Sequence, residues 1–456
     1  MSKLRSKLEP QHVLVYGLGR SGLAVVRHLE RLGWTGAWFD QSDAPNGAEE
    51  AITRGFPRLP SLDQMGLEPT GFDLVVAAPG VMFLHPDLVR LRTTGLETIG
   101  EAELCFRTMN TPTIGVTGTA GKGSTTALIA HLLRAQNINA LEGGNFDPAL
   151  LEIADKCDVA VTELSSFQLE RIVSYRPSVA VLTNLGVDHI SDHGSLELYH
   201  AAKLKIVQNL QPGDALVVPG GLKLKFITKG RVVRVPESGP IVDAQKNVLL
   251  ELADLPAHQH PTNARLAVIA VGLYLEKIGK VCDLEKLRAG LMGFPGVKGR
   301  FETIGEFNGT RFIDDSIATR TLAVQAALEN APGPIAWLLG GRDKGAELKP
   351  LLEIALEKVA VICFFGESGD KFARPFRKAG LKIVDCTAST GEAALEKCVQ
   401  NGLRFATGGS ILLAPLGTSF DQFKDYKARG AAFKAAFEKV TGHKVTGISE
   451  LEEKPS

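Results

Sequence analysis

The 456-residue chain lacks several features that mark other classes of protein. It contains no run of eighteen apolar residues and no apolar signal-peptide core near its N-terminus, so we expect a cytoplasmic protein with no membrane partner. Its 51 Lys and Arg residues are balanced by 51 Asp and Glu residues, which argues against a protein that binds nucleic acid through bulk charge. Aromatic residues make up only 6% of the chain, so an aromatic-rich binding surface is not indicated. The expected partners are small molecules.

Paired cysteine motifs are also missing. The six cysteines include no C-x-x-C pair, and most of them lie in apolar or helical-looking stretches. Buried thiols in a reducing compartment are therefore favoured over disulfides or a cysteine metal site.

The length and the pattern of the chain predict three α/β domains. A chain of this length exceeds the size at which one hydrophobic core keeps growing. Short β-branched runs alternate with amphipathic stretches, a pattern typical of parallel sheets covered by helices, and the pattern occurs three times. We predict an N-terminal Rossmann-like domain (1–108), a central P-loop ATPase-type domain with a mostly parallel sheet (109–301) and a C-terminal Rossmann-like domain (302–456). The predicted strands are Val13–Tyr16, Trp38–Asp40, Thr113–Val116, Val159–Thr162, Val179–Leu182, Ile335–Leu339, Val361–Phe364 and Ser410–Leu413.

The first glycine motif lies between the first predicted strand and a helical run. It reads Gly17-Leu18-Gly19-Arg20-Ser21-Gly22, which is G-x-G-x-x-G, and Asp40 follows eighteen residues after Gly22 at the end of the next strand. Such glycines let the backbone approach a diphosphate at a helix N-terminus, and the acid can meet a ribose hydroxyl. On this motif alone, an NAD-dependent oxidoreductase is one alternative. The motif is nevertheless stronger evidence for a bound diphosphate than for a nicotinamide.

The second glycine motif, GVTGTAGKGSTT at residues 115–126, predicts an ATP phosphate loop. It departs from G-x-x-x-x-G-K-[ST], because Val116 occupies the first glycine position and Gly123 separates Lys122 from Ser124. A strand precedes the motif and an amphipathic helix follows it, which is the context that a phosphate loop requires. The predicted ATP contacts in the loop are Gly118, Thr119, Ala120, Gly121, Lys122, Gly123, Ser124 and Thr125.

Acidic and imidazole side chains follow two neighbouring predicted strands. Glu163 comes directly after Val159–Thr162, where an acid can hold Mg²⁺ together with the hydroxyl of Ser124 or Thr125. The run after Val179–Leu182 contains Asp188 and His189, and a histidine there can coordinate a second cation. We therefore expect ATP and Mg²⁺, with two ions.

Two further segments are TELSSFQLE at 162–170 and LAPLGTSFDQF at 413–423. Together with the glycine motifs and the residues at the strand ends, they resemble the Mur ligases. These ATP-dependent enzymes build the peptide of the bacterial cell-wall precursor, and the resemblance spans essentially the whole chain. Within the family it is strongest to the members that join D-glutamate to UDP-N-acetylmuramoyl-L-alanine. The resemblance implies an N-terminal domain for UDP, a central ATPase domain and a C-terminal domain for the amino acid, and we expect a monomer.

The reaction implied by the resemblance is amide ligation through an acyl phosphate. Lys122 would neutralise phosphate charge, Ser124 and Glu163 would hold one Mg²⁺, and His189 would help to hold the second. Lys203 matches the lysine that the family carbamylates as a ligand between the metals; the sequence by itself would place it on a helix surface. The implied contacts are Gly17, Leu18, Gly19, Arg20, Ser21, Asp40, Gln41, Asn145, Ser165 and His189 for the UDP substrate; Asn263, Arg300 and Asp315 for ATP; and Thr319, Lys344, Ser419 and Tyr426 for D-glutamate.

The resemblance is incomplete at three places, one of which is the run His258-Gln259-His260-Pro261-Thr262-Asn263, where the family prefers His-Asn before the retained asparagine. The Gly-Lys-Gly-Ser order at 121–124 is typical of folylpolyglutamate synthases, which makes a folate ligase the nearest alternative of the same class. Ile317 stands where the D-glutamate ligases carry a lysine, and an isoleucine offers neither charge nor donor. That replacement leaves open a nucleotide-binding relative without catalysis.

Overall fold

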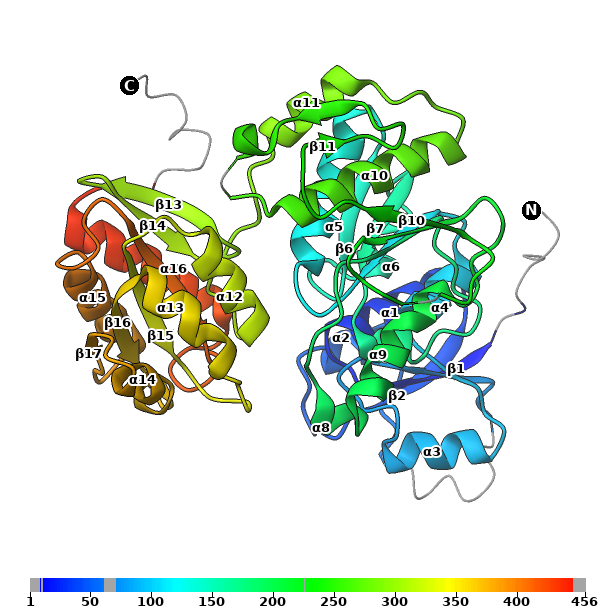
Figure 1. Cartoon of the computed structure of the whole chain (residues 1–456). Coiled ribbons are helices and arrows are strands. Elements are labelled where there is room, and N and C mark those ends of the chain that lie inside the picture. The colour runs from blue at the N-terminus through cyan, green and yellow to red at the C-terminus, as the bar shows by residue number, and fades with distance from the viewer. Residues whose placement is uncertain (1–8, 10, 61–70, 225, 257, 446–456) are drawn as a thin grey trace. The chain divides into compact units, whose positions relative to one another are not determined.

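The computed structural model describes residues 9, 11–60, 71–224, 226–256 and 258–445, and these form two compact units (Figure 1). The first unit extends over Met1–Asp254 and Pro261–Met292, and the second over Leu255–His260 and Gly293–Ser456. The first unit contains two larger sheets, which we call the N-terminal sheet and the central sheet, and a two-stranded sheet. The predicted limits of three domains at 108 and 301 stay a prediction.

The N-terminal sheet has four parallel strands in the order β2-β1-β3-β4. Because β1 is flanked by β2 and β3, the turn after β1 opens at the point where the strand order reverses, which is where doubly wound sheets bind ligands. The first glycine motif occupies this turn. The elements are β1 His12–Tyr16, α1 Arg20–Arg31, β2 Thr35–Phe39, α2 Ala48–Thr53, β3 Leu74–Ala77, α3 Pro86–Thr93, β4 Thr98–Ile99 and α4 Glu101–Thr108.

The central sheet has six parallel strands in the order β10-β9-β8-β5-β7-β6. Strand β5 lies between β8 and β7, so the ends of these three strands bring the phosphate loop, the run after Leu182 and Glu163 to one edge. The elements are β5 Thr113–Thr117, α5 Lys122–Ala135, β6 Ala140–Gly144, α6 Leu150–Ile153, β7 Val159–Glu163, α7 Ser166–Leu169, β8 Val179–Leu182, α8 Ile190–His193, α9 Leu196–Leu204, β9 Ala215–Pro219, β10 Arg231–Val235, an antiparallel pair β11 Ile241–Val242 and β12 Val248–Leu250, α10 Pro261–Lys277 and α11 Leu284–Met292.

The second unit is a six-stranded sheet in the order β13-β14-β18-β15-β16-β17. Helices α12, α13 and α14 bury apolar side chains on one face of it, and α15 and α16 do so on the other. All strand pairs are parallel except β13 with β14, a hairpin at the edge that the sequence did not predict. The elements are β13 Glu302–Phe307, β14 Thr310–Asp314, α12 Thr321–Asn330, β15 Ile335–Gly340, α13 Leu352–Lys358, β16 Val359–Phe365, α14 Gly369–Lys378, β17 Ile383–Asp385, α15 Gly391–Gly402, β18 Ser410–Leu416 and α16 Tyr426–Thr441.

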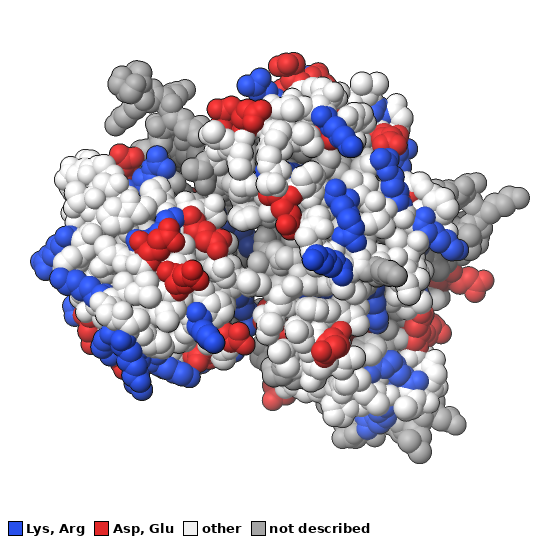
Figure 2. All heavy atoms as spheres, viewed as in Figure 1, with Lys and Arg blue, Asp and Glu red and all other residues white. Residues whose placement is uncertain are grey.

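The predicted α/β class with mostly parallel sheets is confirmed, and each predicted strand overlaps a strand of the structure. All six cysteines are free thiols, and four of them are buried. Of the helices in the described residues, none is both long and apolar enough to cross a membrane. Basic and acidic side chains both occur on the face of each unit drawn in Figure 2.

Candidate functional site

The phosphate loop connects β5 to α5 and depends on glycines at two positions. Gly118 has φ +148°, and an added Cβ would lie 2.0 Å from Thr183 Oγ1. Gly121, directly before α5, has φ +76°, and its Cβ would lie 2.8 Å from Asn263 Oδ1. Residues with a side chain rarely adopt such φ values, so the loop requires glycine at both places. The same contact brings the predicted nucleotide residue Asn263 next to the loop.

Asn184 fixes the loop from the neighbouring strand end. Its Oδ1 accepts hydrogen bonds from the backbone N–H groups of Thr119 (3.1 Å) and Ala120 (2.9 Å), and its Nδ2 donates to the Ala120 carbonyl (3.0 Å). Thr183 Oγ1 donates to the same carbonyl at 2.6 Å. Sequence reasoning gave Asn184 no role. Its position shortly after a buried strand was the available signal that it lies at the same sheet edge as the loop.

The hydroxyl groups at the start of α5 differ in how they are used. Thr125 is fully buried and its Oγ1 donates to the Gly121 carbonyl at 2.9 Å, while Thr126 Oγ1 donates to the Lys122 carbonyl at 2.9 Å. Ser124 is partly exposed, and its hydroxyl has no hydrogen-bond partner among the described residues. Of these three hydroxyls, that of Ser124 is the one available to a ligand.

Glu163 ends β7 as predicted and is only 3% exposed. Its Oε1 accepts a hydrogen bond from Asn145 Nδ2 at 2.9 Å, and its carbonyl accepts one from the Asn145 N–H at 3.0 Å. Asn145 follows β6, the strand next to β7. The structure therefore joins a predicted Mg²⁺ ligand to a predicted substrate residue.

Lys203 is a buried residue, which corrects the surface position that the sequence alone suggested. It lies near the end of α9, is 2% exposed, and places Nζ 4.5 Å from the ring centre of Tyr199. Burial lowers the pKa of the Lys203 amine well below its ordinary value, the charge of Lys122 lowers it further, and Asp188 and Glu163 oppose the shift. The apolar residues around Lys203 on α9 gave no signal that this lysine faces the phosphate loop.

His189 directly precedes α8 with a left-handed backbone, φ +51°. Its Nδ1 lies 2.8 Å from Asp192 Oδ2, and its Nε2 lies 3.6 Å from Asp188 Oδ2. Beside it, His193 is buried, stacks on Phe167, and places Nε2 2.9 Å from Ser166 Oγ. Sequence reasoning missed His193, because a lone histidine in a short helix gives no distinguishing pattern.

Ser165, predicted to contact substrate, caps α7: its Oγ accepts a hydrogen bond from the Gln168 N–H at 3.2 Å.

The donor set near the loop fits Mg²⁺. No group of three His, Cys, Asp or Glu side chains in the described part of the chain is arranged to hold a metal by itself. The carboxylates of Glu163 and Asp188, with the hydroxyl of Ser124, are however the hard oxygen donors that Mg²⁺ binds together with phosphate oxygens and water. A carbamylated Lys203 would add a further carboxylate-type oxygen. Such a site would be completed by phosphate oxygens and water, because these side chains do not form a full set of ligands by themselves.

The first glycine motif lines a cavity of about 590 Å³ between the N-terminal and central sheets. Gly17 has φ +90°, and Gly22 permits close packing, since an added Cβ would lie 2.0 Å from the Gly17 carbonyl. Asp40 supports the turn: its Oδ2 accepts from the Leu18 N–H at 2.7 Å. Predicted substrate residues in the lining are Gly17, Gly19, Arg20, Ser21, Asp40, Gln41 and Asn145, while Leu18 is buried beneath the turn.

Several polar residues of this cavity were not predicted. His85 lies with its Nε2 2.9 Å from Gln41 Nε2, and Tyr16 OH donates to Asp87 Oδ2 at 2.6 Å. Ser21 Oγ donates to the buried Glu101, whose other oxygen accepts from the Leu151 N–H at 3.1 Å. Tyr16 directly precedes the motif at the end of β1, whereas His85 and Asp87, at the start of α3, and Glu101, on α4, lie far from it in sequence. No spacing rule connects them to it.

In the second unit, backbone hydrogen bonds join three loops at the carboxyl ends of β14, β18 and β15. The Leu416 N–H donates to the Ala318 carbonyl at 3.0 Å, and Arg342 and Thr418 exchange two hydrogen bonds of 2.8 and 2.9 Å. Buried Arg429 donates to the carbonyls of Gly417 (2.9 Å) and Ser316 (2.8 Å). The joined loops carry the predicted D-glutamate residues Thr319, Lys344 and Ser419, and Tyr426 begins α16 shortly after them.

Two predicted nucleotide residues also meet in the second unit. Burial raises the pKa of Asp315 to about 7, the positive charge of Arg300 opposes this shift, and Asp314 adds to it. Ile317, which replaces the family lysine, is partly buried, and its N–H donates to the Gly299 carbonyl at 3.3 Å. The structure brings Arg300 and Asp315 together, whereas Asn263 lies by the phosphate loop of the first unit.

Models of three Mur ligase domains match this chain. The MurD-like N-terminal domain of Mur ligases matches residues 11–100, the Mur ligase middle domain residues 116–232, and the Mur ligase glutamate ligase domain residues 299–415. The chain is 48% identical to the UDP-N-acetylmuramoylalanine--D-glutamate ligase of Deinococcus radiodurans, over 94% of this chain and 92% of that protein. It is 45% identical to the enzyme of the same name from Thermus thermophilus, over 93% of this chain and 96% of that protein.

A solved structure shares the fold. The MurF ligase of Thermotoga maritima, determined in complex with ADP, superposes with a TM-score of 0.57 at 15% identity, over 95% of this chain and 96% of that one. At that identity the likeness concerns the fold alone. The sequence identity over nearly the full length of curated relatives decides the family: the chain belongs to the Mur ligases.

Proposed function

We propose that the chain is an ATP-dependent ligase that joins D-glutamate to UDP-N-acetylmuramoyl-L-alanine in peptidoglycan precursor synthesis. The observation that carries the proposal is the phosphate loop with buried Glu163 and Lys203 beside Lys122. The names and the high identity of the relatives support the choice of substrates. The proposal includes a cytoplasmic location, where ATP is available, and action as a monomer.

The first chemical step we propose is the transfer of the γ-phosphoryl group of ATP to the carboxylate of the muramoyl-alanine, which forms an acyl phosphate and leaves ADP. Both reactants are anionic, so the step depends on positive charge and fixed donors rather than on a protein nucleophile. The N–H groups at the start of α5 and the Lys122 ammonium would hold the β- and γ-phosphates. Bound Mg²⁺, held by Ser124, Glu163, His189 and carbamylated Lys203, would supply further positive charge at the phosphate oxygens.

The second step is the attack of the D-glutamate amine on the acyl phosphate, with release of phosphate. The joined loops of the second unit would bind the amino acid, with Lys344 opposite a carboxylate and Thr319, Ser419 and Tyr426 as polar contacts. Lys344 is exposed and forms no ion pair with any described residue, so its charge is available to a dicarboxylic substrate. Asn263, Arg300 and Asp315 would contact ATP.

Phosphate release tests the proposal. The protein is incubated with UDP-N-acetylmuramoyl-L-alanine, ATP and Mg²⁺, and one of D-glutamate, L-glutamate, D-aspartate or L-lysine. Phosphate release with D-glutamate alone is expected; equal rates with all four amino acids would contradict the assignment. Lys122→Ala should abolish release, whereas Lys156→Ala, at an exposed position shortly after α6, should not change it.

A further inference from the structure

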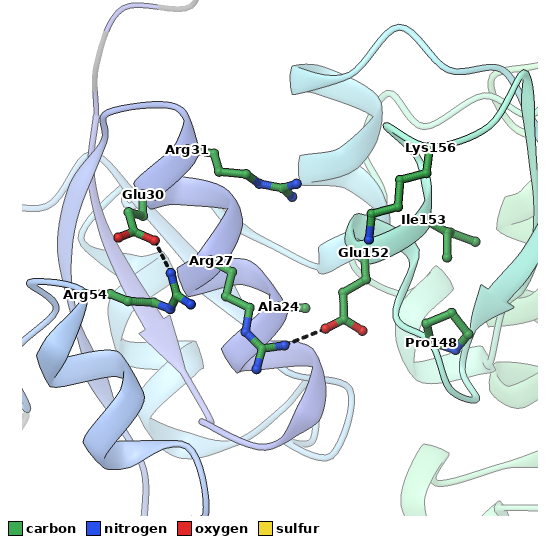
Figure 3. Close-up of a pocket in the computed structure, with 9 residues that line it drawn as sticks. All are labelled: Ala24, Arg27, Glu30, Arg31, Arg54, Pro148, Glu152, Ile153 and Lys156. Carbon is green, nitrogen blue, oxygen red and sulfur yellow. Dashed lines mark hydrogen bonds and ion pairs between the residues drawn. The ribbon is translucent and has the colours of Figure 1, made fainter.

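Helix α1 carries three arginines whose side chains contact the segment between β6 and β7 of the central sheet. Arg20, Arg27 and Arg31 are spaced by seven and four residues, which places them on one helix face. Arg27 donates to Glu152 on α6 at 2.6 Å and to Glu50 at 2.7 Å, and Arg31 pairs with Asp155. Figure 3 shows both arginines directed toward α6 beside a cavity of about 500 Å³. Because carboxylates already neutralise these guanidinium groups, we interpret the contact as docking and not as an anion site.

Arg20 makes a different kind of contact. It is the first residue of α1, directly after Gly19 of the glycine motif, so its backbone belongs to the predicted diphosphate turn. Its side chain turns to the loop after β6: Nη1 donates to Asp147 Oδ1 at 2.9 Å, and Nη2 donates to the carbonyls of Asn145 (2.9 Å) and Gly144 (3.3 Å). One side chain thus joins the first glycine motif to a loop about 125 residues later in the sequence.

The loop that Arg20 holds also holds Glu163. Asn145 donates to Glu163 through both its backbone N–H and its Nδ2. Gly144 pairs with Glu163 in the β6–β7 register, and a Cβ on Gly144 would lie 2.5 Å from the Glu163 carbonyl oxygen. The loop therefore has little room to shift without moving Glu163. From the Arg20 guanidinium to the Glu163 carboxylate there are only two hydrogen bonds, one on each side of Asn145.

We propose that Arg20 is a positioning residue that couples the two glycine motifs. It ties the first motif to Glu163 through Asn145, so that a nucleoside diphosphate on the first motif and a metal–nucleotide complex at Glu163 favour each other's binding. The inference rests on the proposed function for what each motif binds, and it changes the role of Arg20 from substrate contact to link. Asp147 offsets the charge of Arg20, which suits a link better than a phosphate ligand.

The test measures binding rather than turnover. The affinity for Mn²⁺ in the presence of ADP is measured by electron paramagnetic resonance, with and without saturating UDP, and UDP affinity is measured by calorimetry. In the unchanged protein, UDP should raise the Mn²⁺ affinity by roughly fivefold or more, a usual size for coupling between sites. In Arg20→Ala, UDP should no longer raise the Mn²⁺ affinity, so the ratio of the affinities with and without UDP should be about one. Arg20→Lys, which keeps the charge but not the forked donors, should retain part of it.

The control is Arg31→Ala on the same helix face. It removes the ion pair with Asp155 and the hydrogen bond to the Leu151 carbonyl, but no contact with the Asn145 loop. This variant should lower the unfolding temperature and leave the coupling unchanged. Equal loss of coupling in the Arg20 and Arg31 variants would overturn the inference, as would an Arg20→Ala protein that binds UDP more weakly yet keeps the full gain.

Asp147→Asn keeps the assay informative if Arg20→Ala does not fold. It removes the negative charge of one partner of Arg20 but keeps an acceptor oxygen, and it leaves the two carbonyl contacts unchanged. Most of the coupling should therefore persist in Asp147→Asn, and Arg20→Lys should lose more of it. The reverse order would contradict the role assigned to the carbonyl contacts. If the unchanged protein binds UDP and Mn²⁺–ADP independently, only this inference fails. If it binds neither, the proposed function fails as well.

Discussion

Asn184 Oδ1 lies 2.9 Å from the backbone nitrogen of Ala120 and accepts its hydrogen bond, across the boundary between β8 and the phosphate loop. The same amide accepts from Thr119 and donates to the Ala120 carbonyl, so one side chain satisfies three backbone groups of the loop. These two N–H groups donate to Asn184, and the fixed loop orients its other N–H groups before the nucleotide arrives, as the stabilisation of developing charge requires. The Asn184 amide thus supports the loop at Thr119 and Ala120.

Asn184→Ala should lower kcat/KM for ATP by roughly 10- to 100-fold, because a small displacement of positioned groups has effects of this size. Asn184→Asp keeps the acceptor oxygen for the two N–H groups and should lose less. Steady-state kinetics at saturating D-glutamate measure both. The circular dichroism spectra should remain unchanged, and equal activity of the unchanged protein and Asn184→Ala would contradict a loop-supporting role.

Ser124→Ala should weaken the use of Mg–ATP by at least about tenfold, since even outer partners of metal ligands have effects of this size. The matched variant is Thr125→Val, which removes the buried hydroxyl that donates to Gly121 and should lower the free energy of unfolding by about 1 kcal/mol. Titration of activity against Mg²⁺ and chemical unfolding separate the two effects. A Mg²⁺ requirement that changes only in Thr125→Val would transfer the ligand role to that residue.

Carbamylation of Lys203 should be detectable without turnover. A neutral amine reacts with carbon dioxide, and burial beside Lys122 favours the neutral form of Lys203 at pH values where exposed lysines are charged. Protein equilibrated with ¹³C-bicarbonate should show a protein-bound carbamate resonance that disappears in Lys203→Ala. Lys205→Ala, two residues along the chain and partly exposed, should retain it. A resonance that persists in Lys203→Ala would assign the carbamate elsewhere.

Local pattern and strand-end logic predicted a large part of this molecule. The strands at Val13–Tyr16 and Val179–Leu182, both glycine motifs, and Glu163 at the end of β7 follow from alternation of apolar runs with turns. The carboxyl ends of adjacent parallel strands meet at one edge, so the proximity of Glu163 to the phosphate loop was predictable from the order of the motifs along the chain.

Contacts between distant segments were not predictable in this way. The burial of Lys203 depends on how α9 packs against the phosphate loop, and the surrounding residues Ala202 and Leu204 carry no sign of it. The link from Arg20 to Asn145 spans two sheets, and neither residue type is unusual in its own segment. Tertiary packing determines such pairs, and periodicity within one element does not encode them.

The pH dependence of stability should reflect Asp315. The pKa of this acid is raised to about 7 in the folded protein, above its ordinary value of 3.8, so the folded state binds the proton more tightly than the unfolded state. Its contribution to stability is therefore fully present below about pH 4 and is lost as the pH rises to about 7, by at most about 1.4 kcal/mol per pH unit. Asp315→Asn should unfold with a flatter pH dependence over this range, as measured by urea titrations. Parallel curves for the two proteins would contradict the buried, protonated state.

Lys344 provides the sharpest test of the proposed amino-acid site, because a lysine of the same unit serves as its control. Lys344→Ala should raise KM for D-glutamate by about tenfold or more, the usual effect of removing a hydrogen bond to a charged group. The Lys371 ammonium on α14 already pairs with Asp343 at 2.7 Å, next to Lys344 in sequence, so Lys371→Ala should change KM by less than about twofold. If both variants raise KM equally, the loss is a general effect of positive charge near the loop. If only Lys344→Ala does so, and its KM for ATP stays unchanged, the ammonium of Lys344 binds a carboxylate of D-glutamate directly.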